Sequence, residues 1–191
     1  DTGAMLLREA LPIGPEDNAA VLHDRLAELG GRLIVQALVE AQAGSLVPVA
    51  QPDQGVTYAA KLDKAEGVID WRLPAVSLAD RIRAFDPFPG CIATSQPGPS
   101  LKIWQARPVT DRKALADACA ATCALGQPVG PGATVRRTDQ EWWVACGDGA
   151  LALQVLQRPG GKRLSVRQLL QGLKLSEYCQ FDVDGPADPA G

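Results

Sequence analysis

The 191-residue sequence has little histidine and few aromatic side chains, and this limits the chemistry that the chain supports. It contains one histidine, one methionine and 5% aromatic residues. The single histidine, His23, lies beside Asp24 in a segment with helical spacing, and we interpret it as a surface residue. No serine or cysteine then has a plausible basic partner, so the sequence does not support catalysis by an activated nucleophile.

The sequence also lacks an apolar run of about 18 residues, so we expect no segment to span a membrane. The first residues, Asp1 to Met5, show no charged region followed by an apolar one, and therefore do not form a secretory signal. They also lack an initiator methionine, and we expect the natural N-terminus to lie upstream. With 46% hydrophobic residues, the chain has the composition of an ordinary globular protein.

The five cysteines match no spacing that is typical of a zinc site, and their number is odd. They are Cys91, Cys119, Cys123, Cys146 and Cys179. We therefore predict no metal site and interpret them as plain thiols. Such thiols are compatible with a reducing cytoplasm.

Charge is unevenly distributed along the chain. Residues 1–87 carry 8 Lys+Arg and 13 Asp+Glu, net −5, whereas residues 88–178 carry 11 and 6, net +5. The last thirteen residues carry three Asp and no base. A basic half on an acidic protein indicates a local anionic partner rather than a generally adhesive surface.

Hydrophobic spacing divides the chain into two kinds of structure. We expect a strand at 5–13 and an amphipathic helix through Leu22–Ala37, ended by Gly44. This is one βα step of an α/β sheet, and the rest of that sheet is expected upstream. Later, short strands are predicted at 101–104, 142–145 and 151–156, with helices at 75–86, 111–126 and 165–173. The predicted fold is an α/β remnant, the end of a Rossmann-like domain, followed by a small antiparallel β-barrel similar to an OB-fold.

These elements give four predicted regions. Residues 1–44 end the first domain, residues 45–73 are a linker rich in Pro and Gly, residues 74–181 form the barrel domain, and residues 182–191 form a disordered tail.

Several motifs, in order, resemble the methionyl-tRNA formyltransferases. The segment DTGAMLL at 1–7 resembles LDTGDML of that family, and IDW at 69–71 matches its linker. Further matches are TYAAKL (57–62), RIRAFDPFPG (81–90), LKIW (101–104), GDG (147–149) and LQRPGGKR (156–163). Departures from the family pattern are Ala4 for Asp, Asp86 for Asn and Phe88 for Trp, together with the Ala-rich stretch 111–126.

The resemblance implies transfer of a formyl group from 10-formyltetrahydrofolate to the amino group of initiator methionyl-tRNA. Asp1 matches the family's catalytic Asp, which orients and charges a histidine. That histidine, its Asn partner and the folate-contacting loop precede Asp1 in the family. We therefore expect this chain alone to be inactive. We expect the intact enzyme to be a monomer in the cytoplasm.

The same resemblance makes the basic residues candidates for binding tRNA through its phosphates. They are Lys61, Lys64, Lys102, Arg136, Arg137, Arg158, Lys162, Arg163, Arg167 and Lys174.

Two alternatives stay open from the sequence. One is a related folate-dependent enzyme, either a formyltransferase acting on a nucleotide-sugar amine or the hydrolase part of a formyltetrahydrofolate dehydrogenase. The GDG turn and the basic PGGKR segment favour the tRNA enzyme over these. The other is a free-standing RNA-binding module without catalysis, against which the broken βα step argues, because it leaves apolar faces uncovered.

Overall fold

The computed structural model describes residues 2–96, 98, 100–172 and 178–183. It divides into two compact units, residues 1–61 and residues 62–191, which are described separately. Asp1, Lys174 and residues 184–191 of the predicted tail lie outside the described residues.

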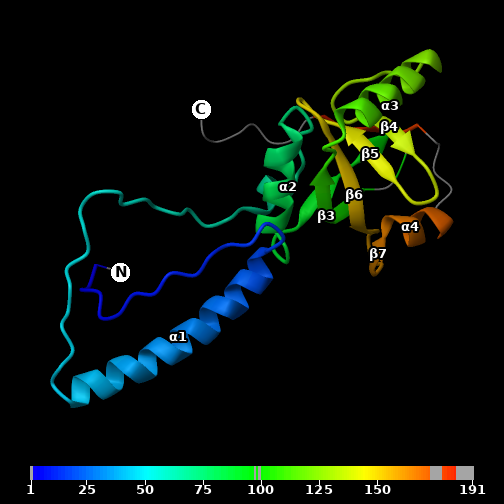
Figure 1. The fold of residues 1–191 in the computed structure, drawn as a ribbon. Coiled ribbons are helices and arrows are strands. Elements are labelled where there is room, and N and C mark those ends of the chain that lie inside the picture. Colours follow the sequence, from blue (N-terminus) through cyan, green and yellow to red (C-terminus); the bar gives the residue numbers. More distant parts are fainter. Residues whose placement is uncertain (1, 97, 99, 173–177, 184–191) are drawn as a thin grey trace. The chain divides into compact units, whose positions relative to one another are not determined.

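The first unit contains one long helix, α1 (Ala19–Gln42), with extended segments before and after it (Figure 1). Asn18 caps its start, because the Asn18 side chain accepts a hydrogen bond from the amide of Val21 at 2.9 Å. Gly44, with φ of 68°, adopts the left-handed conformation that commonly follows a helix end. The predicted helix and its end at Gly44 are thus confirmed.

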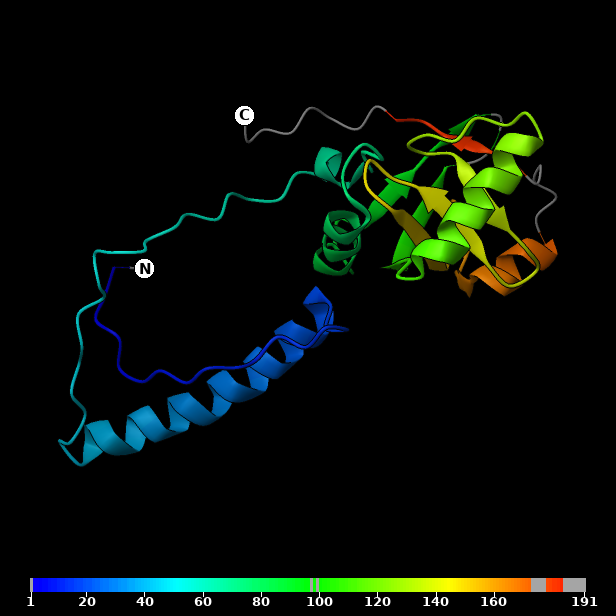
Figure 2. The same cartoon turned by 45° about the horizontal axis from the view of Figure 1, so that its top comes forward.

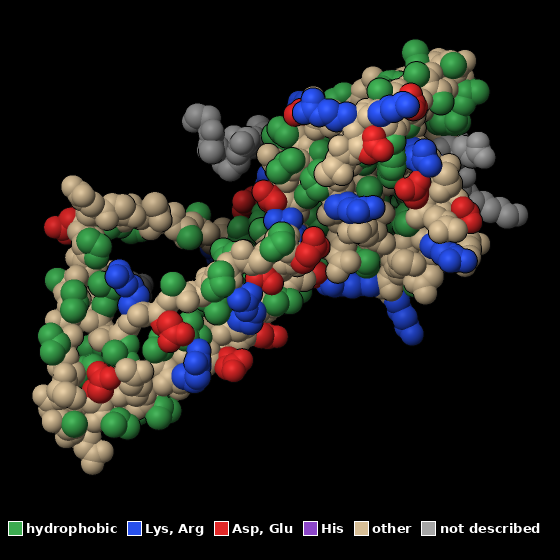
Figure 3. All heavy atoms as spheres, viewed as in Figure 1, with side chains coloured by type: hydrophobic (Ala, Val, Ile, Leu, Met, Phe, Trp, Pro, Cys, Tyr) green, Lys and Arg blue, Asp and Glu red, His purple; other side chains and the backbone are tan. Residues whose placement is uncertain are grey.

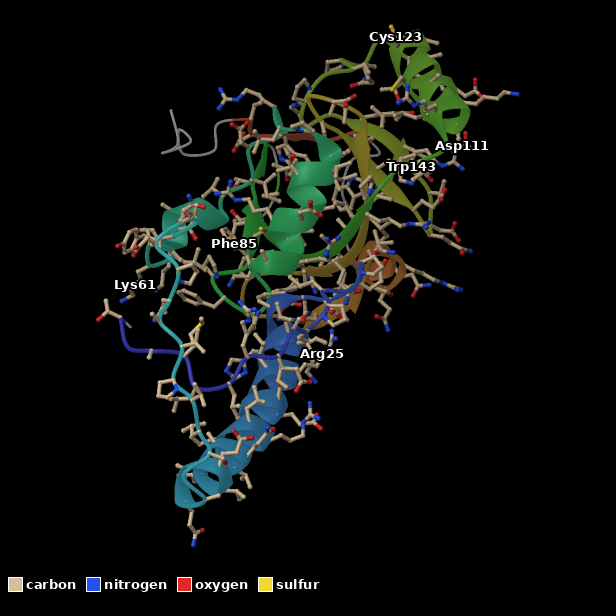
Figure 4. All side chains as sticks on the ribbon, turned by 60° about the vertical axis from the view of Figure 1, so that its left-hand side comes forward. Arg25, Lys61, Phe85, Asp111, Cys123 and Trp143 are labelled. Atoms are coloured by element: carbon tan, nitrogen blue, oxygen red, sulfur yellow. The ribbon has the colours of Figure 1, made fainter. Side chains whose placement is uncertain are left out.

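The strand predicted over residues 5–13 was wrong. Met5 makes an isolated bridge with Val49, and the residues that follow it are extended without a strand partner among those described. A strand needs a neighbour to satisfy its backbone groups, and this unit supplies only the Val49 contact. Arg25 instead holds the loop before α1, donating to the carbonyl oxygen of Pro12 at 3.0 Å and pairing with Asp17 (Figure 4).

Residues 62–73, assigned to the linker from sequence, belong to the second unit in the structure. They include the short 3-10 helix η1 (Lys64–Gly67), after which Ile69 and Trp71 are buried in the core of that unit. The amide of Ile69 donates to the carbonyl oxygen of Ile92 at 2.9 Å. The boundary between the compact units therefore lies at Lys61, because these apolar side chains pack with the residues that follow them.

The helices of the second unit follow the predictions closely. They are α2 (Ala75–Ala84), α3 (Arg112–Ala124) and α4 (Val166–Gly172). A capping box stabilises the start of the last helix, since Ser165 and Gln168 each accept from the other's backbone amide.

Antiparallel strands form the centre of the second unit. The main sheet has the order β1-β3-β6-β5-β4, with β7 also paired to β6. Its strands are β1 (Cys91–Ala93), β3 (Leu101–Pro108), β4 (Thr134–Arg137), β5 (Trp142–Ala145), β6 (Ala150–Gln157) and β7 (Arg163–Ser165). All three strands predicted from sequence are confirmed, β5 with the predicted bounds.

The predicted small β-barrel similar to an OB-fold is not confirmed, because the sheet is not closed by continuous pairing. Two short strands, β2 (Ser95–Gln96) and β8 (Gln180–Phe181), form a separate antiparallel pair. A single bridge between Ala133 and Gln180 joins β8 to the start of β4. The structure thus supports an antiparallel sheet with helices rather than a complete barrel.

The sheet has a hydrophobic cluster on each of its faces. The larger cluster contains α2 and three stacked or tilted aromatic rings: Trp71 and Phe181 are 5.3 Å apart between centroids, and Trp142 and Phe181 are 5.6 Å apart. On the other face, α3 packs its Ala118 against Trp143 and Ala152. Figures 1 and 2 show α2 and α3 on opposite sides of the sheet.

The pairing of β3 with β6 is interrupted at two positions. Ile103 pairs with Leu156 and Gln105 with Val155, so Trp104 is an extra residue on β3. Gln105 is followed by Ala106 opposite Leu153, so Gln154 is an extra residue on β6. Such bulges redirect side chains and increase local twist, and both of these residues lie at candidate sites described below.

Gly147 allows the segment before α2 to pack closely on the turn between β5 and β6. Its amide donates to the carbonyl oxygens of Trp71 at 2.8 Å and Leu73 at 3.1 Å. A Cβ at this position would lie 1.7 Å from the carbonyl oxygen of Arg72. Glycine is required here because there is no room for a Cβ atom, and not because of its backbone dihedral angles.

We predict that Gly147→Ala lowers the free energy of unfolding by about 3 kcal/mol, because backbone must move to accept the methyl group. Gly130→Ala is the matched control, since a Cβ there meets nothing within 4 Å. It should change stability by less than about 1 kcal/mol. Urea unfolding of both variants measures the difference, and equal stability of the two would contradict the close packing at Gly147.

Candidate nucleic-acid interface

Two cationic side chains lie against the indole ring of Trp104. The guanidinium carbon of Arg163 is 3.6 Å from a ring centroid, and the Lys102 Nζ is 5.2 Å from it. Trp104 itself is 6% exposed, and its Nε1 donates to the Gln157 side chain at 2.7 Å. Gln157 in turn donates to the carbonyl oxygen of Gly161 at 2.7 Å, which ties the β6–β7 turn to this ring.

Arg163 is held by a buried carboxylate. Its two terminal nitrogens donate to the two oxygens of Asp86 at 2.7 and 3.2 Å, and Asp86 is 3% exposed. A bidentate pair of this kind fixes the plane of the guanidinium and partly satisfies its donors. Arg163, predicted as a phosphate contact, thus joins β7 to the loop after α2 and already has a carboxylate partner.

Lys102 and Arg158 line a cavity of about 340 Å³ at the end of the sheet. Its other lining residues are Ile92, Ser100, Leu101, Gln157, Pro159 and Gly160, and none of the lining residues is a carboxylate. Lys102 is half-buried and donates only a long 3.4 Å hydrogen bond to the carbonyl oxygen of Pro89. Arg158 and Lys162 are exposed on the adjoining turn. These residues form what we call the turn site: Lys102, Arg158 and Lys162.

Two arginines, with an alanine and a tryptophan between them, form a row across the face of the sheet that carries α3. In the strand register, Arg107 of β3 pairs with Ala152 of β6, Ala152 with Trp143 of β5, and Trp143 with Arg136 of β4. Figure 4 labels Trp143 in this row. The Arg136 guanidinium lies 4.9 Å from the Trp143 ring centroid and donates to Glu141 at 2.7 Å.

A cavity of about 360 Å³ lies beside this row. It is lined by Arg107, Gln140, Glu141, Trp142, Trp143, Ala152, Leu153, Gln154, Ser165, Val166 and Arg167. We call it the outer-face cavity. It brings Arg167, which was predicted from sequence, together with Arg107, Gln140 and Gln154, which were not. Strict alternation along LKIWQARP would place Arg107 on the core side with Leu101 and Ile103, and the bulge at Trp104 turns it outward instead. The sequence shows neither this bulge nor that α4 lies beside Arg107.

The remaining predicted cations are not brought into these two groups. Lys61 is exposed in the first unit, and Lys64 is exposed in η1. The Arg137 guanidinium lies 5.3 Å from the Trp142 ring centroid, at an edge of the main core. On the face shown in Figure 3, Lys and Arg side chains of the second unit are spread over the sheet and its helices with Asp and Glu between them. A uniform basic surface is therefore absent from this view.

Within the described residues, no three His, Cys, Asp or Glu side chains are grouped so that they could hold a metal ion. The same part of the chain contains no helix long and apolar enough to cross a membrane.

All five cysteines are free, and three of them, Cys91, Cys146 and Cys179, are buried. Burial raises the pKa of Cys91 and of Cys146 to about 12, so both are neutral thiols at physiological pH.

A family model and curated proteins both identify formyltransferases as relatives of this chain. The model described as "Formyl transferase, C-terminal domain" matches residues 61–174. The chain is 46% identical over 184 residues to the methionyl-tRNA formyltransferase of Paraburkholderia xenovorans (strain LB400), covering 96% of this chain and 52% of that protein. It is 46% identical over 191 residues to that of Burkholderia mallei (strain ATCC 23344), covering 100% and 53%. The chain spans about half the length of the curated relatives it matches.

Solved structures share the fold at low sequence identity. A crystal structure of a HypX variant from Aquifex aeolicus superposes with a TM-score of 0.60 at 17% identity, covering 89% of this chain and 28% of that one. A second HypX variant gives a TM-score of 0.57 at 15% identity, covering 95% and 32%. At this identity the likeness concerns the fold alone.

The Asp86–Arg163 pair gives a stability prediction. Asp86→Asn keeps the size of the side chain but removes its charge and one acceptor for Arg163, so the free energy of unfolding should fall by about 1–2 kcal/mol. Asp80→Asn is the control, because Asp80 is an exposed partner of Arg83 and such pairs contribute about 0–1 kcal/mol. If the two variants unfold at the same urea concentration, Arg163 is not held as described.

The cysteines give a reactivity prediction. Cys123 is exposed and should react with iodoacetamide at pH 8 in the native protein. Cys91 and Cys146 should react only after unfolding, because burial both raises their pKa and blocks access. Peptide mass spectrometry of native and urea-treated protein locates the modified thiols. Rapid modification of Cys91 or Cys146 in the native protein would show that the core is open.

Proposed function

This chain belongs to the family of formyl transferase C-terminal domains, and we propose that it is the tRNA-contacting part of an enzyme that formylates methionyl-tRNA. The support is its similarity to methionyl-tRNA formyltransferases together with the chemistry of its surface. The proposed reaction moves a formyl group from 10-formyltetrahydrofolate to the amino group of initiator methionyl-tRNA.

The turn site is the single observation that supports RNA contact most directly. Lys102 and Arg158 line one cavity without a carboxylate, and Lys162 is exposed on the same turn. Cations without an acidic neighbour suit the phosphates of a nucleic-acid backbone, because they neutralise charge and release counterions. Contacts of this kind supply affinity and orientation and do not read sequence.

The catalytic part of the proposal rests on Asp1. In the reaction, the amine of the aminoacyl-tRNA attacks the formyl carbon, an oxyanion must be stabilised, and a proton must leave the amine. The proposed role of Asp1 is to orient a histidine and stabilise its positive charge. Asp1 lies outside the described residues, and we assign no described residue to the folate.

We further propose that the protein acts in the cytoplasm as a monomer.

We also propose that the main sheet and the β2–β8 pair together form a barrel related to the OB-fold. The bridge between Ala133 and Gln180 supports this, because it links the β2–β8 pair to the residue before β4, an edge strand of the main sheet. The alternative function is that of a related folate-dependent enzyme acting on another amine. Binding of RNA by this chain would distinguish the proposed function from that alternative.

The turn site predicts salt-dependent binding of tRNA. In the double variant Lys102→Met and Arg158→Gln, the slope of log affinity against log salt should become shallower by about 1.4–1.8, because each phosphate contact contributes about 0.7–0.9. The control is Arg112→Gln with Lys113→Gln, two exposed cations on α3. Fluorescence titrations with initiator tRNA between low and moderate salt measure both. An unchanged slope in the turn-site variant would place the RNA elsewhere.

The catalytic proposal predicts a loss of formylation activity in two cases. The 191-residue polypeptide alone should not formylate methionyl-tRNA, because one carboxylate cannot position two substrates, and positioning is worth about 7–11 kcal/mol of barrier in favourable cases. In a longer protein, with the other half of the relatives' length before Asp1, the Asp1→Asn variant should fold but lose most activity. Both are measured by formylation with added 10-formyltetrahydrofolate. Turnover by the short polypeptide, or full activity of Asp1→Asn, contradicts the role given to Asp1.

A further inference from the structure

The outer-face cavity brings together two arginines that are far apart in sequence. Arg107 comes from β3 and Arg167 from α4, and both are exposed and line the same cavity of about 360 Å³. The family resemblance did not single out Arg107, and the turn site contains neither arginine. Their convergence depends on β7, which pairs with β6 and leads directly into α4.

The positive charge of this cavity is not neutralised by its own lining. Neither Arg107 nor Arg167 has an ion-pair partner in the described part of the chain. Glu141 is the single carboxylate among the lining residues, and it accepts a 2.7 Å hydrogen bond from Arg136. Arg136 offsets the charge of Glu141, so the two free guanidiniums give the cavity a net positive charge.

The other lining groups favour a polar backbone over a stacked base. Arg136 lies over the Trp143 ring, whose residue is 9% exposed, so that ring offers no open face for a base. Gln140, Gln154 and Ser165 supply amide and hydroxyl groups that can hydrogen-bond to sugar hydroxyls and phosphate oxygens. Gln154 follows Ala150 and Ala152 in the alternation of β6 and is exposed on the same face.

We propose that the outer-face cavity binds a phosphodiester group of the RNA backbone, with Arg107 and Arg167 as its two cationic contacts. Guanidinium groups present paired donors that match two oxygens of one phosphate. The site positions the RNA and carries no sequence information. This inference rests on the proposed function and adds a second contact region, on the face that carries α3, to the turn site.

The test compares arginine variants in the same tRNA titration. Arg107→Gln with Arg167→Gln should weaken binding and make the log–log salt slope shallower by about 1.4–1.8, as expected for two lost phosphate contacts. Arg107→Lys with Arg167→Lys keeps the charge but loses the paired donors, and should retain most of the slope with weaker binding. Arg112→Gln, an exposed arginine outside the cavity lining, should leave both quantities unchanged. Thermal unfolding should be the same in all variants, because the substituted side chains are exposed.

The outcomes separate this inference from the proposed function. If the turn-site variant loses salt-dependent binding and the Arg107/Arg167 variant does not, the inference is wrong and the proposed function stands. If the wild-type chain shows no salt-dependent binding of tRNA, both fail.

Two further anions, each at matched ionic strength, test whether the cavity binds the RNA backbone or another anion. Inorganic phosphate is added in thermal unfolding, and polyglutamate is added as a competitor of tRNA. Phosphate that raises the melting temperature of the wild type but not of the glutamine variant, while tRNA binding is equal in both, assigns the cavity to a free anion and overturns the inference. Displacement of tRNA by polyglutamate as effectively as by unlabelled RNA also overturns it. Displacement by RNA alone supports it.

Discussion

The antiparallel pairing of β3 with β6 is the interaction on which the second unit depends. These are its two longest strands, and each face of the pair supports a different part of the structure. Leu101, Ile103 and Leu156 pack into the main core with α2, whereas Ala152 belongs to the cluster beneath α3. β1 pairs with β3, β5 and β7 pair with β6, and β4 is attached to the pair through β5. The positions of both candidate RNA-contacting regions therefore follow from this one register.

The bulges in that pairing connect the fold to the surface chemistry. A regular ladder would keep strict alternation along β3 and would place Arg107 on the core side with Leu101 and Ile103. With the bulge at Trp104, Ala106 belongs to the main core instead, and Arg107 is exposed and lines the outer-face cavity. A local irregularity of the backbone thus decides that an arginine reaches this cavity.

Electrostatic pairing then divides the cations into structural and available ones. Arg163 is held by buried Asp86, and Arg136 by Glu141, so their charges are largely compensated. Lys102, Arg158, Arg107 and Arg167 line cavities without such compensation. A net-charge count treats all of these residues alike. The distinction matters because a cation already paired with a carboxylate gains less from a phosphate than an unpaired one.

The sequence by itself determined the local elements and the family. The spacing of Leu22–Ala37 and the apolar runs of β3, β5 and β6 are short-range signals, and the structure has a helix and strands there. The ordered motifs likewise led to the formyltransferase resemblance that the comparisons bear out. Only tertiary structure decided that residues 62–73 pack into the second unit, that residues 5–13 form no strand, that Arg163 is paired with Asp86, and that Arg107 meets Arg167. These outcomes depend on partners far away in the chain, and a pattern with a period of a few residues carries no information about which distant partner is present.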